Sequence, residues 1–364
     1  MRILEIIPQL SSGGAERFTV DLCNELSKTN EVMLLTFYPL NEYGFYSSEL
    51  TSSVTLLSLD KPQGLSLRTF KKVLSVIKNF KPDVVHIHLR AIVYCLPALL
   101  IYNKVKYFMT IHSAADKEAD GYWGFLMRKI CFKAGIVKPI TISNESHNSF
   151  IKYYKVNADI IYNGRDVSAQ AIRISDSSRE EVEKCKNHPS DKVIINLARI
   201  NEVKRQNLLA KVVDRLYKEG YTFTVIIVGN KRDERLVNEI ESYNCPLVHL
   251  LGEKSNPLEY LKLSDAYCLC SSYEGMPISL IEAIGVGIVP ICTPVGGIVD
   301  VIKDGYNGIL AKGLMEDDLY NAIKTFLQLT NSQIDDLRQN VIRSYEPYSM
   351  AECARKYEML FRSC

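Results

Sequence analysis

Several features that would assign this 364-residue sequence to other protein classes are missing from it. Its longest apolar run, residues 91–102, is about a dozen residues where a membrane span needs about 20, so we predict a buried helix there. The first residues lack the basic segment, long apolar core and small-residue cleavage site of a signal peptide, and we expect a cytoplasmic protein. None of the ten cysteines forms a C-x-x-C pair, which favours buried reduced thiols over disulfides or zinc.

Strong charge and paired aspartates are also missing. The net charge is only +2, which argues against a nucleic-acid-binding protein, because such proteins need a basic face. The balance is uneven, with 20 Lys and Arg against 14 Asp and Glu in residues 1–165, so the two halves should meet different partners. The sequence contains no D-x-D motif, so it lacks the usual carboxylate pair that holds a metal ion on a diphosphate.

What the sequence does contain is a regular alternation of apolar strands and amphipathic helices, which predicts parallel sheets covered on both faces. The predicted strands are residues 2–7, 32–37, 54–59, 83–88, 107–111 and 140–143 in a first series, and 192–197, 223–228, 247–251, 266–270 and 289–292 in a second. We expect an α/β protein with two doubly wound, Rossmann-like domains, residues 1–167 and 168–344, with a helix over 345–364 packing back on the first. Such a pair should place a ligand cleft at the carboxyl ends of the strands.

The most informative segment runs from Ser271 to Ala283. A strand ends before it, Glu274 and Gly275 lie in a turn, and Pro277 suits the start of a helix. Free N–H groups at such a helix start favour an anion or sugar oxygens, and Gly275 permits close approach. Glu274 and Glu282 can hold two ends of one ligand through its hydroxyl groups, although a helix-capping acid and a solvated glutamate are the plain alternative.

A second segment places Arg199 and Lys204 in the loop after the strand over residues 192–197. Arginine offers a planar fork for phosphate oxygens and lysine a mobile charge, so the pair can neutralise a departing diphosphate. Two solvated surface cations are the alternative interpretation.

The first domain contributes two further candidates. Gly13 and Gly14 open the first helix and would let a ligand approach the backbone, but the segment is no G-x-G-x-x-G and no ribose-binding acid ends the next strand, which counts against a dehydrogenase. His86, His88 and His112 end two strands and are expected to face the cleft. Zinc is conceivable from His-x-His, but no third ligand has a recognisable spacing, so we expect no metal.

These segments together resemble the family 4 retaining glycosyltransferases of the GT-B fold over most of the chain. The resemblance rests on Gly13-Gly14-Ala15-Glu16, residues 83–88, Thr110-Ile111-His112, Tyr162-Asn163-Gly164, Arg199 with Lys204, Glu274-Gly275-Met276-Pro277 with Glu282, Val295-Gly296-Gly297 and residues 304–308. Two departures are Ala198, where the family commonly has glycine, and the lack of Phe-x-Pro after Gly164.

The resemblance implies roles for these residues. Glu282 would hold the nucleotide ribose, Arg199 and Lys204 the diphosphate, and Glu274 the donor sugar together with the backbone of Gly275, Met276 and Pro277. His112 would lie beside the reactive face of the sugar, Gly13 and Gly14 would contact the donor, and we assign His86 and His88 to the acceptor. The catalytic set is therefore His112, Arg199, Lys204 and Glu274.

The predicted reaction is transfer of a hexose-type sugar to a glycan or lipid-linked glycan, with retention, without metal or cofactor, in bacterial surface polysaccharide synthesis. A UDP-sugar is preferred over a GDP-sugar as donor, although no residue distinguishes them. The basic, amphipathic stretch from Leu67 to Lys78 suggests contact with an anionic membrane at the cytoplasmic face, an ordinary solvated helix being the alternative. A nucleotide-sugar epimerase and a non-catalytic binding subunit remain as rival functions.

Overall fold

A computed structural model describes residues 1–118, 121–167 and 169–363 of the chain. They form two compact units, unit 1 from Met1–Arg165 with Tyr348–Cys364, and unit 2 from Asp166–Pro347. The chain thus leaves unit 1 after Arg165 and returns to it at Tyr348. Ser168 and Cys364, which belong to the predicted domain ranges, lie outside the described residues.

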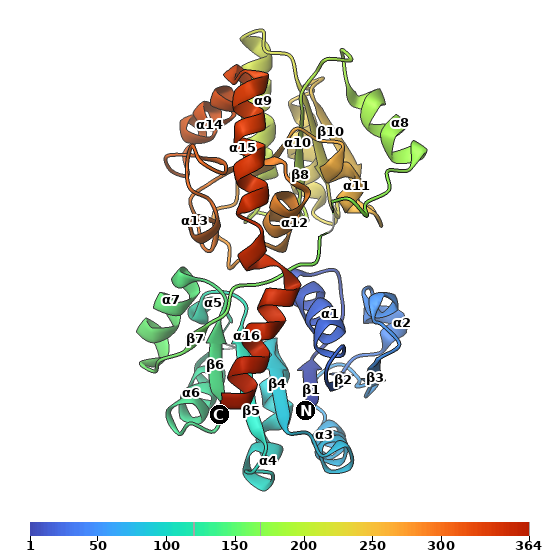
Figure 1. Cartoon of the computed structure of the whole chain (residues 1–364), viewed down its shortest axis with the longest axis vertical. Helices are drawn as coiled ribbons and strands as arrows, with labels where there is room; N and C mark the ends of the chain where they lie inside the picture. The colour runs from blue at the N-terminus through green and yellow to red at the C-terminus, as the bar shows by residue number, and fades with distance from the viewer. Residues whose placement is uncertain (119–120, 168, 364) are drawn as a thin grey trace. The chain divides into compact units, whose positions relative to one another are not determined.

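Unit 1 is built on a seven-stranded, fully parallel sheet in the order β3-β2-β1-β4-β5-β6-β7 (Figure 1). Its strands are β1 Arg2–Ile7, β2 Glu31–Thr36, β3 Val54–Ser58, β4 Val84–His88, β5 Lys106–Ile111, β6 Lys138–Thr141 and β7 Asp159–Ile160. Its α-helices are α1 Gly14–Leu26, α2 Leu40–Tyr43, α3 Leu67–Phe80, α4 Ile92–Ile101, α5 Ala115–Glu118, α6 Gly121–Lys133, α7 Asn144–Tyr154 and α16 Met350–Ser363. Short 3-10 turns cover Ser47–Glu49 and Leu89–Ala91, and a third, Glu346–Tyr348, spans the point where the chain returns to unit 1.

The two faces of this sheet are covered differently. One face packs on α3, α4, α6 and α7 through an apolar core that includes Leu4, Val85 and Met109. The other face meets α1 and α16, and Figure 1 shows α16 running across β4, β5 and β6. Because side chains alternate along a strand, the residues next to those three in sequence point toward α1 and α16.

The helix α16 is fixed to unit 1 at the Tyr162-Asn163-Gly164 segment. A Cβ atom on Gly164 would lie 2.6 Å from that of Cys353, so only glycine lets the two segments approach so closely. The guanidinium of Arg165 donates to Asp21 on α1 at 3.0 Å. This segment of the family resemblance therefore has a packing function.

Unit 2 repeats the plan with six parallel strands in the order β10-β9-β8-β11-β12-β13. The strands are β8 Val193–Leu197, β9 Thr224–Val228, β10 Val248–Gly252, β11 Ala266–Leu269, β12 Val289–Cys292 and β13 Ile309–Leu310. The helices are α8 Asp176–Cys185, α9 Gln206–Lys218, α10 Glu234–Ser242, α11 Pro257–Lys262, α12 Ile278–Val286, α13 Ile298–Val301, α14 Glu316–Gln328 and α15 Asn331–Arg343. Leu209, Leu236 and Phe326 are among the side chains that helices contribute to its main core.

The eleven predicted strands all occur, with ends that shift by a residue or two. The two-residue edge strands β7 and β13 are missing from the prediction, because two residues carry no periodicity. Residues 91–102 form a helix as expected, but Leu100 is 76% exposed and Ile101 59% exposed, so its end is not buried. Nine free cysteines are buried, and within the described ranges no helix is long and apolar enough to span a membrane.

Candidate functional site

The loops that carry the predicted charges of unit 2 lie side by side because of the strand order. β8 is paired with β9 on one side and β11 on the other, so the loops after β8 and β11 leave neighbouring strands in opposite directions along the sheet. In doubly wound sheets this switch point opens a crevice in which ligands bind. We call residues 198–205 the Arg199 loop and residues 271–277 the Glu274 loop.

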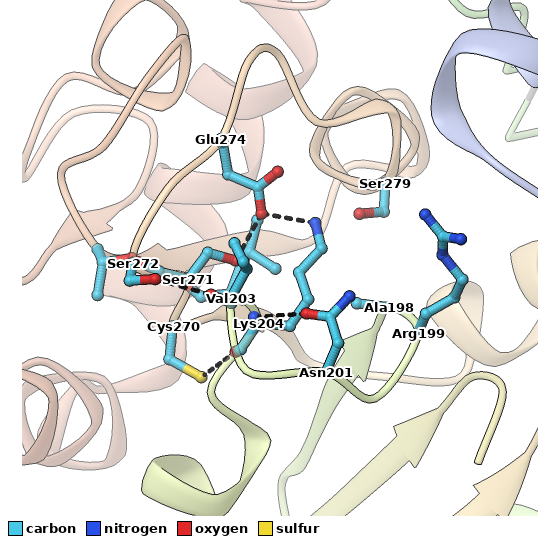
Figure 2. A network of polar contacts seen from close by, with 12 residues as sticks. Ala198, Arg199, Asn201, Val203, Lys204, Cys270, Ser271, Ser272, Glu274 and Ser279 are labelled. Carbon is cyan, nitrogen blue, oxygen red and sulfur yellow. Dashed lines mark hydrogen bonds and ion pairs between the residues drawn. The ribbon is translucent and has the colours of Figure 1, made fainter. Parts of the chain in front are cut away.

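An ion pair joins the two loops. The Lys204 ammonium lies 2.6 Å from Oε1 of Glu274, and the Ser271 hydroxyl donates to the same oxygen (Figure 2). The side chains of Lys204 and Glu274 are 21% and 9% exposed, so the pair is partly shielded from water. An ammonium has three N–H donors, and Lys204 can therefore hold Glu274 while it still donates to an anion.

Arg199 is held by its backbone, and its side chain is exposed. The buried amide of Gln206 donates to the Arg199 carbonyl at 3.0 Å, and Asn201 accepts from the Lys204 N–H at 3.0 Å. No salt bridge to the Arg199 guanidinium occurs among the residues that the structure describes, and in Figure 2 it points to the same side of the loop as the Lys204 ammonium. Of the two predicted cations, one is therefore engaged within the protein and one is available to a ligand.

The Glu274 loop ends at α12. Pro277 is the N-cap residue, one position before the helix, and its carbonyl accepts from the N–H of Leu280. Among the described residues, the N–H groups of Ile278 and Ser279 have no backbone acceptor outside the helix, as expected for a helix start. Gly275 is half-buried, Met276 and Pro277 are buried, and Glu282 lies 7% exposed within α12.

A glycine turn that the sequence interpretation left without a role supports this loop. Gly296 has φ +58°, and a Cβ atom there would lie 2.0 Å from the Glu274 carbonyl oxygen. The neighbouring Gly297 N–H donates to the Gly275 carbonyl at 2.6 Å, and the Thr293 hydroxyl donates to the Ser271 backbone carbonyl at 2.6 Å. The paired glycines after β12 were the signal that could have revealed this contact.

In unit 1 the histidines form a buried cluster around an acid that the sequence interpretation missed. Oε2 of Glu5, on β1, lies 2.8 Å from His88 Nε2 and 2.9 Å from His86 Nδ1. His88 Nδ1 lies 2.9 Å from His112 Nε2, and His86 Nε2 lies 2.8 Å from the Thr110 hydroxyl. We call these five side chains the histidine cluster. A single acid within the apolar strand Arg2–Ile7 was the available signal.

Burial shifts the ionisation of the histidine cluster. Desolvation raises the pKa of Glu5, but His86 and His88 outweigh it and hold that pKa at about 2. Burial and the neighbouring His86 lower the pKa of His88 to about 4, although the Glu5 carboxylate acts to raise it. Burial also lowers the pKa of His112 well below its ordinary value. At neutral pH the cluster thus holds one carboxylate, with His88 and His112 uncharged.

The position of His86 and His88 bears on the prediction that they bind an acceptor. Both side chains are 0% exposed and lie within hydrogen-bond distance of other members of the cluster. Their role toward an acceptor therefore stays a prediction without support from this arrangement, because alternation along β4 directs both rings toward α1 and α16 instead of toward solvent. His112, in the loop after β5, is partly exposed.

Gly13 and Gly14 lie in the turn between β1 and α1. Gly13 caps the helix, and a Cβ atom on it would lie 2.2 Å from a carboxylate oxygen of Glu16, so the glycine makes room for that acid. The Ser11 hydroxyl donates to the same carboxylate at 3.0 Å. The Glu16 side chain thus lies against Gly13, whereas Gly14 is exposed, and contact of either glycine with a donor stays a prediction.

Glu5, His86 and His88 are the one group of three metal-ligating side chains, within the described ranges, whose ligand atoms lie within 4.8 Å of one another. Protons between these side chains are enough to explain the short distances from Glu5 to His86 and His88. All three side chains are completely buried. We therefore propose no metal site at these three residues.

Comparison with known families identifies the chain. A family model described as Glycosyltransferase Family 4 matches residues 12–169, and one described as Glycosyl transferases group 1 matches residues 177–344. This chain is a family 4 glycosyltransferase. The Arg199 and Glu274 loops lie within the second match and the histidines within the first.

Two named relatives of this glycosyltransferase come from bacteria. One is a Campylobacter jejuni enzyme named as GalNAc-alpha-(1->4)-GalNAc-alpha-(1->3)-diNAcBac-PP-undecaprenol alpha-1,4-N-acetyl-D-galactosaminyltransferase. It is 27% identical over 322 residues, which cover 85% of this chain and 84% of that protein. Another is the capsular polysaccharide biosynthesis glycosyltransferase CapH of Staphylococcus aureus, 25% identical with 78% of each chain covered.

Solved structures give the same fold. A glycosyltransferase from Rickettsia africae ESF-5 superposes with a TM-score of 0.83 at 19% identity, covering 100% of this chain and 98% of that one. Anabaena Alr3699/HepE, solved in complex with UDP and glucose, gives 0.83 at 18% identity with 100% of both chains covered. The predicted GT-B fold, with two Rossmann-like α/β domains, is confirmed.

Proposed function

We propose that this glycosyltransferase moves a hexose-type sugar from a nucleoside diphosphate sugar to a glycan or lipid-linked glycan, with retention at the anomeric carbon and without a metal ion. The observation that carries the proposal is the pair of cations, Arg199 and Lys204, on one loop at the switch point of unit 2. Two cations there can neutralise a diphosphate, the task that a metal bound by D-x-D performs elsewhere.

The two cations have different parts in this proposal. The exposed Arg199 guanidinium receives the diphosphate first, since it has a fork geometry suited to phosphate oxygens. Lys204 is oriented by Glu274 at 2.6 Å and offers its remaining N–H donors to the phosphate that leaves. Because the ammonium is already positioned, little reorganisation is needed as negative charge develops.

The Glu274 loop and α12 hold the rest of the donor. Glu274 accepts hydrogen bonds from sugar hydroxyls with the oxygen that Lys204 does not occupy, and the first-turn N–H groups of α12 donate to sugar or phosphate oxygens. Glu282, within α12, accepts from the ribose hydroxyls. A UDP-sugar is the preferred donor, and the Anabaena structure named for its complex with UDP and glucose supports that choice.

Retention follows from a front-face displacement in this proposal. The acceptor oxygen bonds to the anomeric carbon on the face that the diphosphate leaves, the carbon–oxygen bond to phosphate breaks, and the departing phosphate oxygen takes the acceptor proton. The pairing of Glu274 with Lys204 supports this route over a covalent one, since an ion-paired carboxylate is a weak nucleophile. The protein contributes positioning and charge stabilisation.

A lipid-linked acceptor at the cytoplasmic face of a membrane completes the proposal. Support comes from the Campylobacter jejuni relative, whose name includes a PP-undecaprenol acceptor. In α3 the apolar stripe of Val73, Ile77 and Phe80 is buried in the core, which corrects its interpretation as a membrane-facing surface. Basic side chains remain exposed on the helix, and Leu65 and Leu67 before and at its start are 75% and 76% exposed.

The donor assignment is tested by thermal shift and sugar release with a panel of UDP- and GDP-sugars in EDTA. We compare the wild type with Glu282→Ala and with Glu241→Ala, an exposed glutamate on α10 of the same unit. A bound donor should raise Tm through mass action and be slowly hydrolysed, and only Glu282→Ala should lose both effects. Binding without release would indicate a binding subunit, and a rearranged free sugar an epimerase. No response to any nucleotide sugar would overturn the proposal.

Membrane contact is tested by flotation with vesicles of phosphatidylglycerol and phosphatidylcholine at low salt. The wild type should float with anionic vesicles only, and a double variant, Leu65→Ser with Leu67→Ser, should float less. Equal recovery with neutral vesicles, or no flotation at all, contradicts the membrane part and leaves the donor part untouched.

A further inference from the structure

The side chains of Glu5, His88 and His112 form a continuous series of contacts from the middle of β1 to the loop after β5. Glu5 Oε2 lies 2.8 Å from His88 Nε2, and His88 Nδ1 lies 2.9 Å from His112 Nε2. Glu5 and His88 are completely buried, so water does not compete for these contacts. Both ring nitrogens of His88 are engaged, one toward each end of the series.

The chemistry of the three groups fixes the direction of both hydrogen bonds. An ionised carboxylate can only accept, so the hydrogen of His88 must be on Nε2. A neutral imidazole has one hydrogen, which leaves Nδ1 of His88 as an acceptor. His112 must then donate from Nε2, and its own Nδ1 is left without a hydrogen. The charge states agree, because the pKa of Glu5 is held at about 2 and that of His88 at about 4.

The residues around His112 hold its ring in place and leave the direction of the two hydrogen bonds unchanged. The Phe18 ring, on α1, meets it edge-on with centroids 5.7 Å apart. The Glu118 carboxylate accepts from the backbone N–H of His112 at 2.7 Å, and so fixes the loop and not the ring. Nδ1 of His112 is buried and has no hydrogen-bond partner in the part of the chain that the structure describes.

His86 belongs to the histidine cluster but not to the series of contacts from Glu5 through His88 to His112. Its Nδ1 lies 2.9 Å from Glu5 Oε2 without alignment for a hydrogen bond, and its Nε2 meets the Thr110 hydroxyl, which in turn contacts Tyr357 at 2.9 Å. That path ends on α16. His86 therefore provides a control of equal burial on the same strand.

We propose that Glu5 and His88 are positioning residues that keep the hydrogen of the His112 ring on Nε2 and so leave Nδ1 as a fixed hydrogen-bond acceptor for a ligand that carries a hydroxyl group. The assignment of the ligand rests on the proposed function, whereas the placement of the hydrogen does not. A fixed acceptor selects a ligand that presents a hydroxyl, because an ether or a deoxy position at that point has no hydrogen to donate.

Nitrogen NMR of the full-length protein, labelled with ¹⁵N at histidine, tests the hydrogen placement. The chain has six histidines, and the signals of His112 are assigned as those lost in His112→Asn. The wild type without ligand should show His112 as a neutral ring with hydrogen on Nε2 alone from pH 6 to pH 8. A charged ring, or hydrogen on Nδ1, overturns the proposal whatever the enzyme's substrate.

Matched variants test the chain of contacts. His88→Gln should release the His112 ring into a mixture of the two neutral forms, whereas His86→Gln should leave hydrogen on Nε2 alone. An unchanged His112 spectrum in a folded His88→Gln protein overturns the role of His88, and if that variant does not fold, the wild-type spectrum still decides. Failure of the nucleotide-sugar panel with the predicted spectrum intact would refute the proposed function alone.

Discussion

In unit 1 the noteworthy ionisable groups lie within the sheet, and in unit 2 they lie on loops beyond the ends of the strands. The histidine cluster projects from β1, β4 and β5 and, apart from His112, is buried. Arg199, Lys204 and Glu274 follow β8 and β11 and keep contact with solvent. Both units have the switch-point topology, so topology alone does not decide where the charges lie.

The contrast indicates different tasks. Within a sheet, low dielectric and fixed neighbours hold each proton at one atom and shift the pKa, which suits a permanent hydrogen-bond pattern. On a loop, cations keep their charge and can capture and release an anion. Four experiments can break or sharpen this comparison.

The largest effect should come from Lys204→Ala, which removes a pre-positioned cation from the leaving group. We expect turnover to fall about 10²–10³-fold, as for other preorganised electrostatic groups, with a smaller change in donor affinity. Steady-state kinetics together with Tm measure it. Lys211→Ala, a half-exposed lysine on α9 paired with Glu316 at 2.7 Å, should keep normal turnover. A kcat near the wild-type value in Lys204→Ala would sink the assignment.

Acidification should weaken unit 1 more than unit 2. The folded pKa of His88 is about 4, below its ordinary 6.5, so the unfolded chain binds a proton that the folded one does not as pH falls from 6.5 toward 4. Stability should therefore drop over this window, by about 2 kcal/mol at pH 5 from His88 alone. Below pH 4.5 the low pKa of Glu5 adds a further loss.

Denaturant-dependent hydrogen exchange, followed separately on peptides from β4 and β9, measures that difference. In unit 2 partial burial lowers the pKa of His249, so unit 2 should lose less stability than unit 1 on acidification. Equal losses in both units between pH 7 and pH 5 would contradict the comparison.

A third test targets the turn that supports the Glu274 loop. Gly296→Ala introduces a Cβ atom 2.0 Å from the Glu274 carbonyl oxygen at φ +58°. We expect a loss of about 1–3 kcal/mol in unit 2 and weaker donor binding. Gly220→Ala, at φ +90° with open space around it, suffers the backbone strain without the collision. If the two variants bind donor equally well, the turn does not support the loop.

The smallest effect is expected from Lys155→Gly. Lys155 ends α7 at φ +57°, a conformation that costs a side chain energy and suits glycine. Unit 1 should gain about 0.5–1 kcal/mol, while Lys152→Gly inside the same helix should lose about 1 kcal/mol. Urea midpoints from β4 and β9 peptides should move in unit 1 only; a parallel shift in unit 2 would mean that the units do not unfold separately.

Much of the fold was predictable because strands buried on both faces leave a strong apolar signal. β1 has the predicted ends, and the loops of Arg199 and Glu274 follow strands as expected. The apolar stripe of α3 suggested a membrane surface, but periodicity only says that a stripe is covered, and the core of unit 1 covers it.

The sequence by itself determined the two series of strands, the family, and the residue types at the ends of β8 and β11. Only the tertiary structure decided the partners: that Lys204 is paired with Glu274, that Gly296 touches the Glu274 carbonyl, and that an acid on β1 meets the histidines of β4. The reason is physical. Local pattern records which face of a strand or helix is covered, whereas hydrogen-bond partners depend on strand order and register, which bring residues 70 or more positions apart to within 3 Å.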